Sequence, residues 1–167
     1  MTPPNLPVDD ELRLRPYAGE EDIDLAWPWY RDPETVALVD GDGSAVYPRD
    51  RVAAMYAALQ AQGEVYLIER RTPEGAWEAV GDVTLAPDTV PIVVAPGCRR
   101  QGIGRRALLR LVDRARVLEW EALHVREVYA GNEAAHRLFT GIGFVPRAVA
   151  PPIMSLRLSP LGGRARP

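Results

Sequence analysis

The segment Gly97–Arg105 combines glycines and arginines in a pattern that suits a negatively charged group. It reads Gly-Cys-Arg-Arg-Gln-Gly-Ile-Gly-Arg and leads directly into a helical repeat. The first turn of a helix leaves backbone N–H groups unpaired and carries a partial positive charge, so it attracts anions. Glycines at 102 and 104 would let a phosphate approach the backbone. Three arginines would add charged donors around it: Arg99, Arg100 and Arg105.

Two other interpretations of this segment compete with a phosphate-binding loop. The glycines could only turn a surface loop, with solvated arginines beside them. The run Gly102–Ala107 also matches the G-x-G-x-x-A pattern of dinucleotide-binding folds. That pattern is normally followed by an acidic residue at the end of the next strand, whereas Glu119 and Glu121 come before the next predicted strand. The arginines and the preceding strand favour the phosphate-binding loop.

Strands and helices alternate along the chain and would position this loop. Apolar residues at helical spacing predict a long helix over 102–120, after a strand over 89–95. Pro91 has no N–H to donate, so strand pairing should be irregular there. Further strands are predicted over 11–15, 65–70, 77–85, 123–130 and 153–158. Further helices are predicted over 20–27, from 32, over 50–63 and over 132–140, with Pro28 separating the first two.

The order of these elements predicts a mixed α/β layer fold. We expect one domain over 1–160 and a loose C-terminal tail over 161–167. No basic start or long apolar run marks a secretory signal or a membrane span, so we expect a soluble, cytoplasmic protein.

The composition excludes several classes of protein. All 20 basic residues are arginine, whereas Walker A proteins, pyridoxal enzymes and protein kinases each need a specific lysine. Cys98 is the only cysteine, and His124 and His136 are the only histidines, so we expect neither a disulfide nor a metal site. A net charge of −3 gives no indication of nucleic-acid or membrane binding.

Two motifs, in this order, resemble the GNAT superfamily of acyl-CoA-dependent N-acyltransferases. The first is [RQ]-x-x-G-x-[GA], matched by Arg99-x-x-Gly102-x-Gly104 after a strand. The second is the helix Asn132-Glu133-Ala134-Ala135-His136-Arg137-Leu138-Phe139, followed by Gly143-Phe144. The match is specific over 89–144, and elsewhere over 12–158 it rests on element order. The overall similarity favours the subgroup of ribosomal-protein N-terminal and aminoglycoside 6'-type acetyltransferases.

This resemblance implies an α/β (α+β) fold of the three-layer GNAT type. A strongly twisted mixed sheet, flanked by helices, would have central strands that splay apart between 89–95 and 123–130. The resulting cleft would take the pantetheine arm of acetyl-CoA, the expected co-substrate. The residues implied to hold it are Ile92, Val93 and Val94 by their backbone, Arg99, Arg100, Gln101, Gly102, Ile103, Gly104 and Arg105 at the pyrophosphate, and Asn132, Ala135 and Phe139 toward the thioester.

Acetylation of an amine needs a neutral nitrogen near the thioester, a donor for the developing oxyanion and a proton for the leaving thiolate. A backbone N–H near Val93 or Val94, left free by the splayed strand, is the candidate oxyanion donor. Asp82 and Glu127 are candidate bases because both lie on strands expected to border the cleft.

The proton for the thiolate is a separate question. Many family members have a tyrosine at the position of Phe139, and that tyrosine is the usual acid, whereas phenylalanine has no hydroxyl. Either Tyr129 or a water replaces it, or the thiolate leaves without a dedicated acid. The second functional class considered is a catalytically degenerate acyl-CoA-binding sensor or structural protein, which Phe139 makes conceivable.

The N-terminal third supplies aromatic and acidic residues to the wall that holds the acceptor in the family. They are Trp27, Trp29, Tyr30, Asp32, Glu34, Asp40 and Asp42. Such residues suit a cationic amine, although the aromatics could equally be core residues. The expected acceptor is a primary amine of a peptide or small molecule, such as a polyamine or an aminoglycoside, attacking directly in a ternary complex. Homodimer formation is left open.

Overall fold

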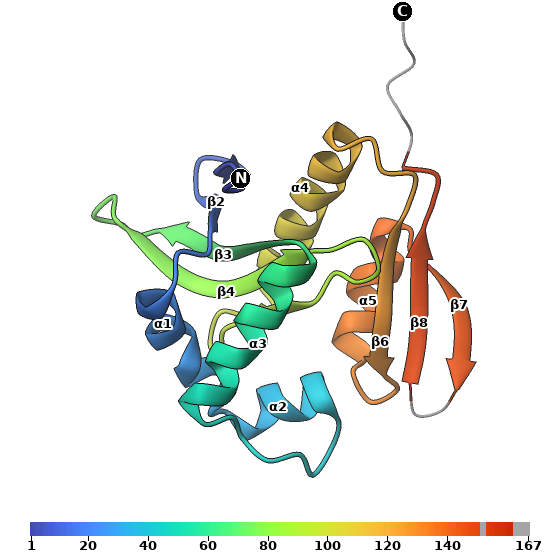
Figure 1. Ribbon diagram of the computed structural model, residues 1–167, viewed down its shortest axis with the longest axis horizontal. Helices are drawn as coiled ribbons and strands as arrows, with labels where there is room; N and C mark the ends of the chain where they lie inside the picture. The colour runs from blue at the N-terminus through green and yellow to red at the C-terminus, as the bar shows by residue number, and fades with distance from the viewer. Residues whose placement is uncertain (151–152, 162–167) are drawn as a thin grey trace, which may run out of the picture.

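The computed structural model describes residues 1–150 and 153–161, and it contains two antiparallel sheets (Figure 1). The first sheet has the order β1-β2-β3-β4-β5, with β1 at Leu6–Pro7, β2 at Leu12–Pro16, β3 at Glu64–Arg71, β4 at Trp77–Leu85 and β5 at Ile92–Val94. The second has the order β6-β8-β7, with β6 at Leu123–Tyr129, β7 at Val145–Ala150 and β8 at Ile153–Leu158. The expected splay therefore divides the sheet between β5 and β6.

Helices cover both faces of the first sheet, which gives the expected three layers (Figure 1). On one face lie α1 (Glu20–Tyr30) and α3 (Arg49–Gln62), with α2 (Pro33–Asp40) between them in the chain. On the other face lies α4 (Ile103–Val117), and α5 (Glu133–Ile142) packs between α4 and the second sheet. The predicted α/β fold is confirmed.

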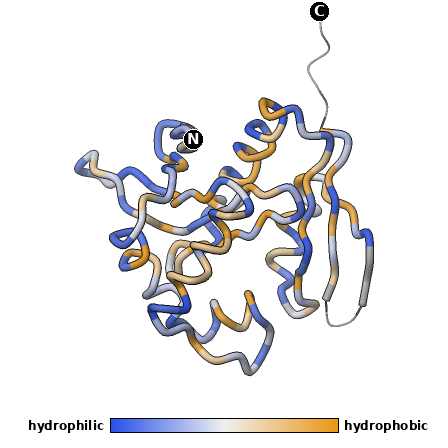
Figure 2. Tube along the Cα trace, viewed as in Figure 1, coloured by the Kyte–Doolittle hydropathy of each residue, from blue (hydrophilic) through white to orange (hydrophobic). Residues whose placement is uncertain are grey.

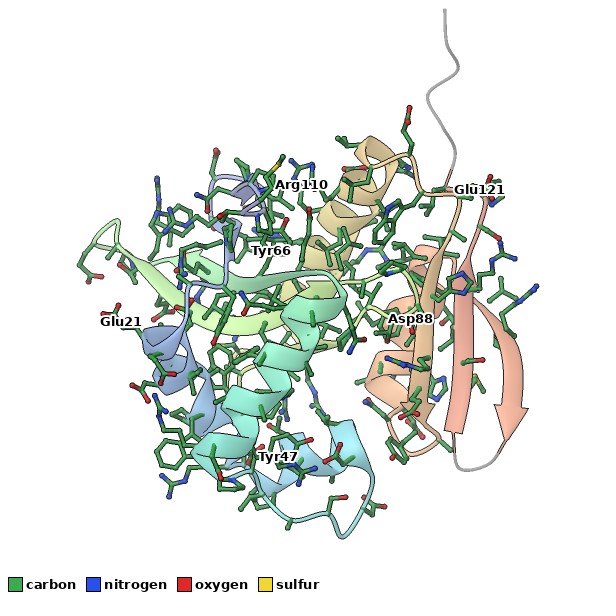
Figure 3. The ribbon with its side chains drawn as sticks, viewed as in Figure 1. Glu21, Tyr47, Tyr66, Asp88, Arg110 and Glu121 are labelled. Atoms are coloured by element: carbon green, nitrogen blue, oxygen red, sulfur yellow. The ribbon has the colours of Figure 1, made fainter. Side chains whose placement is uncertain are left out.

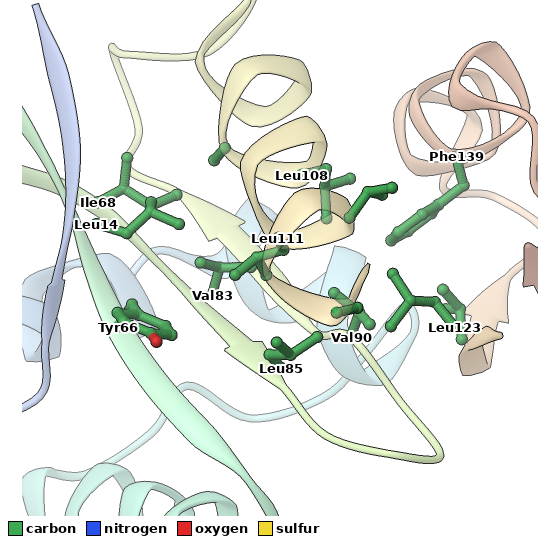
Figure 4. Close-up of a cluster of buried hydrophobic side chains, with 14 of the residues drawn as sticks. Leu14, Tyr66, Ile68, Val83, Leu85, Val90, Leu108, Leu111, Leu123 and Phe139 are labelled. Atoms are coloured by element: carbon green, nitrogen blue, oxygen red, sulfur yellow. The ribbon is translucent and has the colours of Figure 1, made fainter. Parts of the chain in front are cut away.

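Two hydrophobic clusters hold the layers together. Hydrophobic and hydrophilic residues alternate along α4, which buries its apolar side on the sheet (Figure 2). Figure 4 shows Leu111 of α4 beside Val83 of the sheet, and Leu108 on the side of α4 that faces Phe139 of α5. Because the same buried cluster includes Leu123 and Val125 of β6, this core also joins the two sheets. The second cluster packs α1 and α3 on the opposite face.

The helix predicted to end before Pro28 continues through it. Pro28 lies inside α1, which ends at Tyr30. A proline removes one N–H from the helix and crowds the preceding turn. Here it is exposed and lies in the last turn of the helix, where few bonds depend on it. As a result, Tyr30 is carried on α1 and buried against the sheet.

Several strand boundaries differ from those predicted. Strand β5 is limited to Ile92–Val94, and Pro91 pairs only through its carbonyl, which accepts from the Thr84 N–H at 3.0 Å. Strands β1 and β7 were not predicted, because β1 has two residues and Pro146 in β7 lies beside a register shift. Leu161, assigned to the tail, is buried and donates its N–H to Glu121, while 162–167 lie outside the described residues.

Candidate functional site

A cleft of about 1300 Å³ opens at the splay between the sheets. Strands β5 and β6, the first turn of α4, α5 and the inner side of α2 line it. Most of the predicted site residues border it: Asp82, Ile92, Val93, Val94, Arg99, Arg100, Gly102, Ile103, Gly104, Arg105, Glu127, Asn132, Ala135 and Phe139. Gln101 and Tyr129 are not among the residues that line it.

The first turn of α4 presents free backbone donors to this cleft. The first helical bond runs from the Arg106 N–H to the Gly102 carbonyl at 3.1 Å. Within the described residues, the N–H groups of Gly102, Ile103, Gly104 and Arg105 donate to no protein acceptor. Unpaired donors at the positive end of a helix fit a phosphate or pyrophosphate. The loop thus has the geometry that its sequence indicated.

The two glycines of the motif have different roles. Gly102 has a φ of 75°, a left-handed conformation that glycine adopts without strain, and an added Cβ would meet nothing within 4 Å. At Gly104, an added Cβ would lie 3.3 Å from Leu138 Cδ2 of α5. We expected both glycines to admit a phosphate, but Gly104 also allows close packing of α4 on α5.

The three arginines of the loop are not equivalent. The Arg99 guanidinium donates to Thr35 Oγ1 at 2.6 Å and to the Val94 carbonyl at 3.2 Å, and lies 3.5 Å from Glu34. It therefore ties the loop to α2. Arg105 reaches the Gly141 carbonyl at 3.1 Å. Arg100 is exposed at the cleft and, within the part of the chain that the structure describes, forms no ion pair. Of the three, Arg100 is the arginine whose guanidinium has no protein partner among the described residues, so its predicted role at the phosphate is the one to test.

Strand β5 turns an unpaired edge toward the cleft. Its bonds to β4 include Thr84 N–H to Pro91 at 3.0 Å and Ala95 N–H to Val80 at 2.8 Å, and Asp82 pairs with Val93 between them. Because hydrogen-bonded pairs alternate in an antiparallel ladder, the backbone N–H and C=O of Val93 point toward β4. The N–H groups of residues 92 and 94 then face the opposite edge, where the sheet ends. Of the two N–H groups considered as oxyanion donors, that of Val94 is therefore the remaining candidate, because that of Val93 points toward β4.

Asn132 is the N-cap of α5. Its Oδ1 accepts from the Ala135 N–H at 3.0 Å, and its Nδ2 donates to the Leu38 carbonyl at 3.1 Å. Asn132 therefore fixes the start of α5 and ties α2 to the second sheet. Together with Arg99, it holds α2 across one end of the cleft. A role toward the pantetheine arm stays a prediction.

Asp82 is a buried carboxylate held by two phenols. Tyr30 Oη donates to Asp82 Oδ2 at 2.9 Å, and Tyr56 Oη donates to the same atom at 2.7 Å. Burial raises the pKa of Asp82 to about 6, although the two hydroxyls act to lower it. A carboxyl group with this pKa at a cleft is suited to accept a proton near neutral pH.

The other candidate catalytic residues lie on β6 and α5. Glu127 is exposed at a register shift of β6, between Val125 and Val128, and it lines the cleft. Tyr129 packs near Gly41, where an added Cβ would lie 2.9 Å from its ring. Phe139 is buried with its ring 5.2 Å from that of Phe144. None of these contacts assigns a donor for the thiolate.

The aromatic residues of the N-terminal third are divided between core and cleft. Tyr30 and Tyr47 stack with ring centroids 5.4 Å apart, and Tyr47 Oη donates to Asp40 at 2.6 Å. Figure 3 places Tyr47 beside α2, near the start of α3. Of the cluster predicted from the sequence, only Tyr30, Glu34 and Asp40 line the cleft, and Trp29 is core.

Two residues of the site were missed in the sequence. Tyr56 was recognised only as an apolar position of a helix, and Thr35 was not singled out. Their partners Asp82 and Arg99 are far away along the chain, so no local pattern indicates them. The only available signal was a hydroxyl on a residue at an otherwise apolar helical position.

Comparisons with known proteins agree with this geometry. The model of the acetyltransferase (GNAT) family matches residues 10–144. No curated protein matches the chain. In the described residues, no helix has both the length and the apolar character needed to cross a membrane.

Solved structures share the fold at low sequence identity. Spermidine N-acetyltransferase from Vibrio cholerae, in complex with CoA and spermine, has a TM-score of 0.71 and 14% identity, covering 91% of this chain and 97% of that one. The protein yncA of Salmonella typhimurium, with its cofactor acetyl-CoA, has a TM-score of 0.64 and 21% identity, covering 93% and 97%. An acetyltransferase of Salmonella typhimurium that modifies the N-terminal serine of ribosomal protein L7/L12 has a TM-score of 0.69 and 15% identity, covering 93% and 99%.

The family model spans most of the chain and includes both motifs, the splayed strands and the first turn of α4. The unpaired donors of that turn fit the pyrophosphate of coenzyme A. The chain therefore belongs to the acetyltransferase (GNAT) family and is an acyl-CoA-dependent N-acetyltransferase with acetyl-CoA as its co-substrate.

Proposed function

We propose that this enzyme acetylates a primary amine of a cationic small molecule or peptide, with Asp82 as the general base. The observation that carries this proposal is Asp82 itself, a carboxyl group at the cleft with a pKa raised to about 6 by burial. The acceptor and acetyl-CoA would be bound together, so that the amine attacks the thioester directly.

The residues of the cleft have distinct tasks in this reaction. The first turn of α4 and Arg100 hold the pyrophosphate, which fixes the position of the thioester. Asp82 takes a proton from the ammonium or the attacking amine. As the nitrogen–carbon bond forms and the carbon–sulfur bond breaks, the N–H of Val94 stabilises the negative oxygen. The thiolate gains its proton from water or a residue other than Phe139.

The preference for a cation rests on the acidic side chains around the acceptor end. Glu34 and Asp40 of α2 line the cleft on one side, and Glu127 of β6 lines it on the other. Glu127 is exposed, and within the described residues it forms no ion pair. Because Glu34 pairs with Arg99 and Asp40 with Arg51, Glu127 is the acidic group left to attract a second positive charge on the substrate. The spermidine N-acetyltransferase of Vibrio cholerae, solved with spermine, shares this fold.

A screen of amines with acetyl-CoA tests the activity and the preference together. Release of free thiol would be followed with spermidine, an aminoglycoside, a peptide with a free N-terminus, 1,6-diaminohexane and hexylamine. The last two form a matched pair that differs by one amino group. We expect the diamine to have at least about tenfold higher kcat/KM at low salt, and the advantage to shrink as salt screens the acidic groups. Equal values for the pair would exclude the cationic preference.

The alternative function is binding of acetyl-CoA without turnover. It is favoured by one observation, the buried Phe139 at the position where many family members have a tyrosine. Both functions predict stabilisation of the protein by CoA, but only the enzyme releases thiol. Tight CoA binding without thiol release above background for every amine would favour a sensor.

A further inference from the structure

The carboxyl group of Asp82 is buried without a cationic partner. It lies on β4 under α1 and α3, and in the described residues no arginine forms an ion pair with it. An ionised carboxylate in such a place costs free energy unless hydrogen bonds compensate for the lost water. The groups that supply those bonds therefore decide how much of Asp82 is ionised.

Both compensating bonds come from tyrosines and end on one oxygen. Tyr30 is the last residue of α1 and Tyr56 lies within α3, and their hydroxyls approach Asp82 Oδ2 at 2.9 and 2.7 Å. Among the described residues, no donor bonds to Oδ1. Because Asp82 also lines the cleft, Oδ1 is the oxygen left to accept a proton from the substrate.

We propose that Tyr30 and Tyr56 are positioning residues that set the proton affinity of Asp82. Their hydroxyls fix Oδ2 from the buried side, direct Oδ1 toward the acceptor amine and keep part of the carboxyl group ionised at neutral pH. This inference rests on the proposed role of Asp82 as the base.

The two phenols are suited to donate and not to exchange protons. Burial and the nearby charge of Asp82 raise the pKa of Tyr30 and of Tyr56 far above the ordinary range, so both hydroxyls keep their protons. Their rings are also fixed, since Tyr30 stacks on Tyr47 and Tyr56 packs on Tyr17 with centroids 4.8 Å apart.

Other charged groups border the same cleft, but none is bonded to Asp82 in the part of the chain that is described. They are Glu34 and Asp40 on α2, Arg99 and Arg100 in the loop, Arg105 on α4, Arg126 and Glu127 on β6, and Glu133 and Arg137 on α5. Two causes set the pKa of Asp82: burial raises it, and the hydrogen bonds from the two tyrosine hydroxyls lower it. The tyrosines are therefore the groups to change.

The test is a direct titration of Asp82 by carbon-13 NMR of its carboxyl group, assigned with Asp82→Asn. The variants are Tyr30→Phe, Tyr56→Phe and the double variant, each of which removes hydroxyls and keeps the rings. Tyr17→Phe is the control, because it removes a hydroxyl from the same aromatic cluster without touching Asp82. We expect each lost hydroxyl to raise the pKa of Asp82 by about one unit, a tenfold change in its ionisation.

An unchanged titration of Asp82 in both single variants, with native circular dichroism, would overturn the proposal. If one variant fails to fold, the other carries the test. The acidic limb of the pH profile of kcat/KM should move upward in the same variants and stay in place in Tyr17→Phe. The pKa of Asp82 from NMR could shift while the acidic limb of the kcat/KM profile stays in place. That result would confirm that the phenols set the pKa of Asp82 but would show that Asp82 is not the base. The two failures are therefore distinguishable.

Discussion

At the scale of single residues, the site depends on one carboxyl group in an unusual environment. Asp82 is buried, bonded by two neutral hydroxyls and placed opposite Val93 on the strand that lines the cleft. Neutral donors support a negative charge less than an arginine would, so burial prevails and raises the pKa of Asp82. The same environment that suits a base therefore lowers stability at neutral pH.

The pH dependence of stability should reveal this cost. The folded state binds a proton at Asp82 more tightly than the unfolded state does, so this contribution is present near pH 4 and is lost as the pH rises through about 6. A shift from 3.8 to about 6 corresponds to about 3 kcal/mol. Urea unfolding of wild type and Asp82→Asn between pH 4 and 8 measures it. The asparagine variant should gain relative stability with rising pH, and a constant difference would contradict the assigned environment.

Phe139 offers a second test at this scale. Phe139→Tyr adds a hydroxyl at a residue that lines the cleft, and that the family resemblance implies is near the thioester. We predict a rise in kcat of up to about tenfold, at the low end of the effect of a positioned acid, with unchanged binding of CoA. Thiol-release kinetics and a CoA titration measure the two quantities. An unchanged or lower kcat with normal stability would show that this position no longer serves the proton transfer.

At the scale of elements, the first turn of α4 and the edge of β5 form the proposed cofactor site. The glycine at 102 is left-handed, the N–H groups that follow are unpaired, and the strand before the loop ends at an unpaired edge. In the proposed site, backbone N–H groups would therefore supply most of the contacts to the cofactor, and the arginine side chains would add charge. Because backbone donors and charged side chains both come from one short segment, the glycines and arginines of that segment are enough to predict the loop from the sequence.

Arg100 is the loop side chain whose removal should matter most for the cofactor. Arg100→Ala removes an exposed charge at the cleft, whereas Arg147→Ala removes an exposed charge from β7, outside the lining of the cleft. We expect the Kd of CoA to rise about 5- to 30-fold in the first variant and to stay within about twofold in the second. Calorimetric titration and the CoA-induced rise in Tm measure this. Equal losses would point to a general charge effect.

The order of elements was predictable because most of them are long and have clear periodicity. Strand β4 and the helices α3 and α4 were recognised from apolar spacing, and the Asn132 cap from its residue type. The weak points were prolines. Pro28 was assigned as a break although a last helical turn tolerates it. Strand β1 has only two residues, and β7 contains Pro146 beside a register shift, so neither shows a clear strand pattern.

At the scale of the whole molecule, long-range contacts assemble the site, and these could not be predicted. Asp82 meets Tyr56, Arg99 meets Thr35, and Asn132 meets Leu38 across large separations in the sequence. Sequence patterns place residues on the faces of elements but do not tell which faces meet. The cofactor loop was therefore predictable, whereas the environment of the base was not.

One buried ion network joins the N-terminal elements into a frame for the cleft. Arg15 on β2 donates to Asp22 on α1 at 2.6 Å and to Glu69 on β3 at 2.7 Å. Both acids are buried, with side chains 5% and 8% exposed. Glu69 also pairs with Arg13 at 2.6 Å, so loss of Arg15 would leave the buried Asp22 as the carboxylate without a cationic partner. This contact fixes α1, which carries Tyr30.

Arg15→Met should therefore destabilise the protein by about 3 kcal/mol. Arg49→Met is the matched control, since Arg49 also bonds two acids, Glu20 and Asp24 of α1, but at the exposed surface. Exposed pairs of this kind contribute little because water and salt screen them. Denaturant unfolding should show a large loss for the first variant and a small one for the second. Similar losses would mean that burial of the network is not what stabilises it.

The central claim is that the chain transfers acetyl groups and that Asp82 takes the proton, and one comparison tests it most directly. It measures kcat for thiol release and the Kd of CoA in wild type and Asp82→Asn, with the best amine of the screen at pH 7.5. We predict that kcat falls by about 10²- to 10⁴-fold, as expected for loss of a general base, while the Kd stays within about threefold. An Asp82→Asn protein that keeps its kcat would contradict the account.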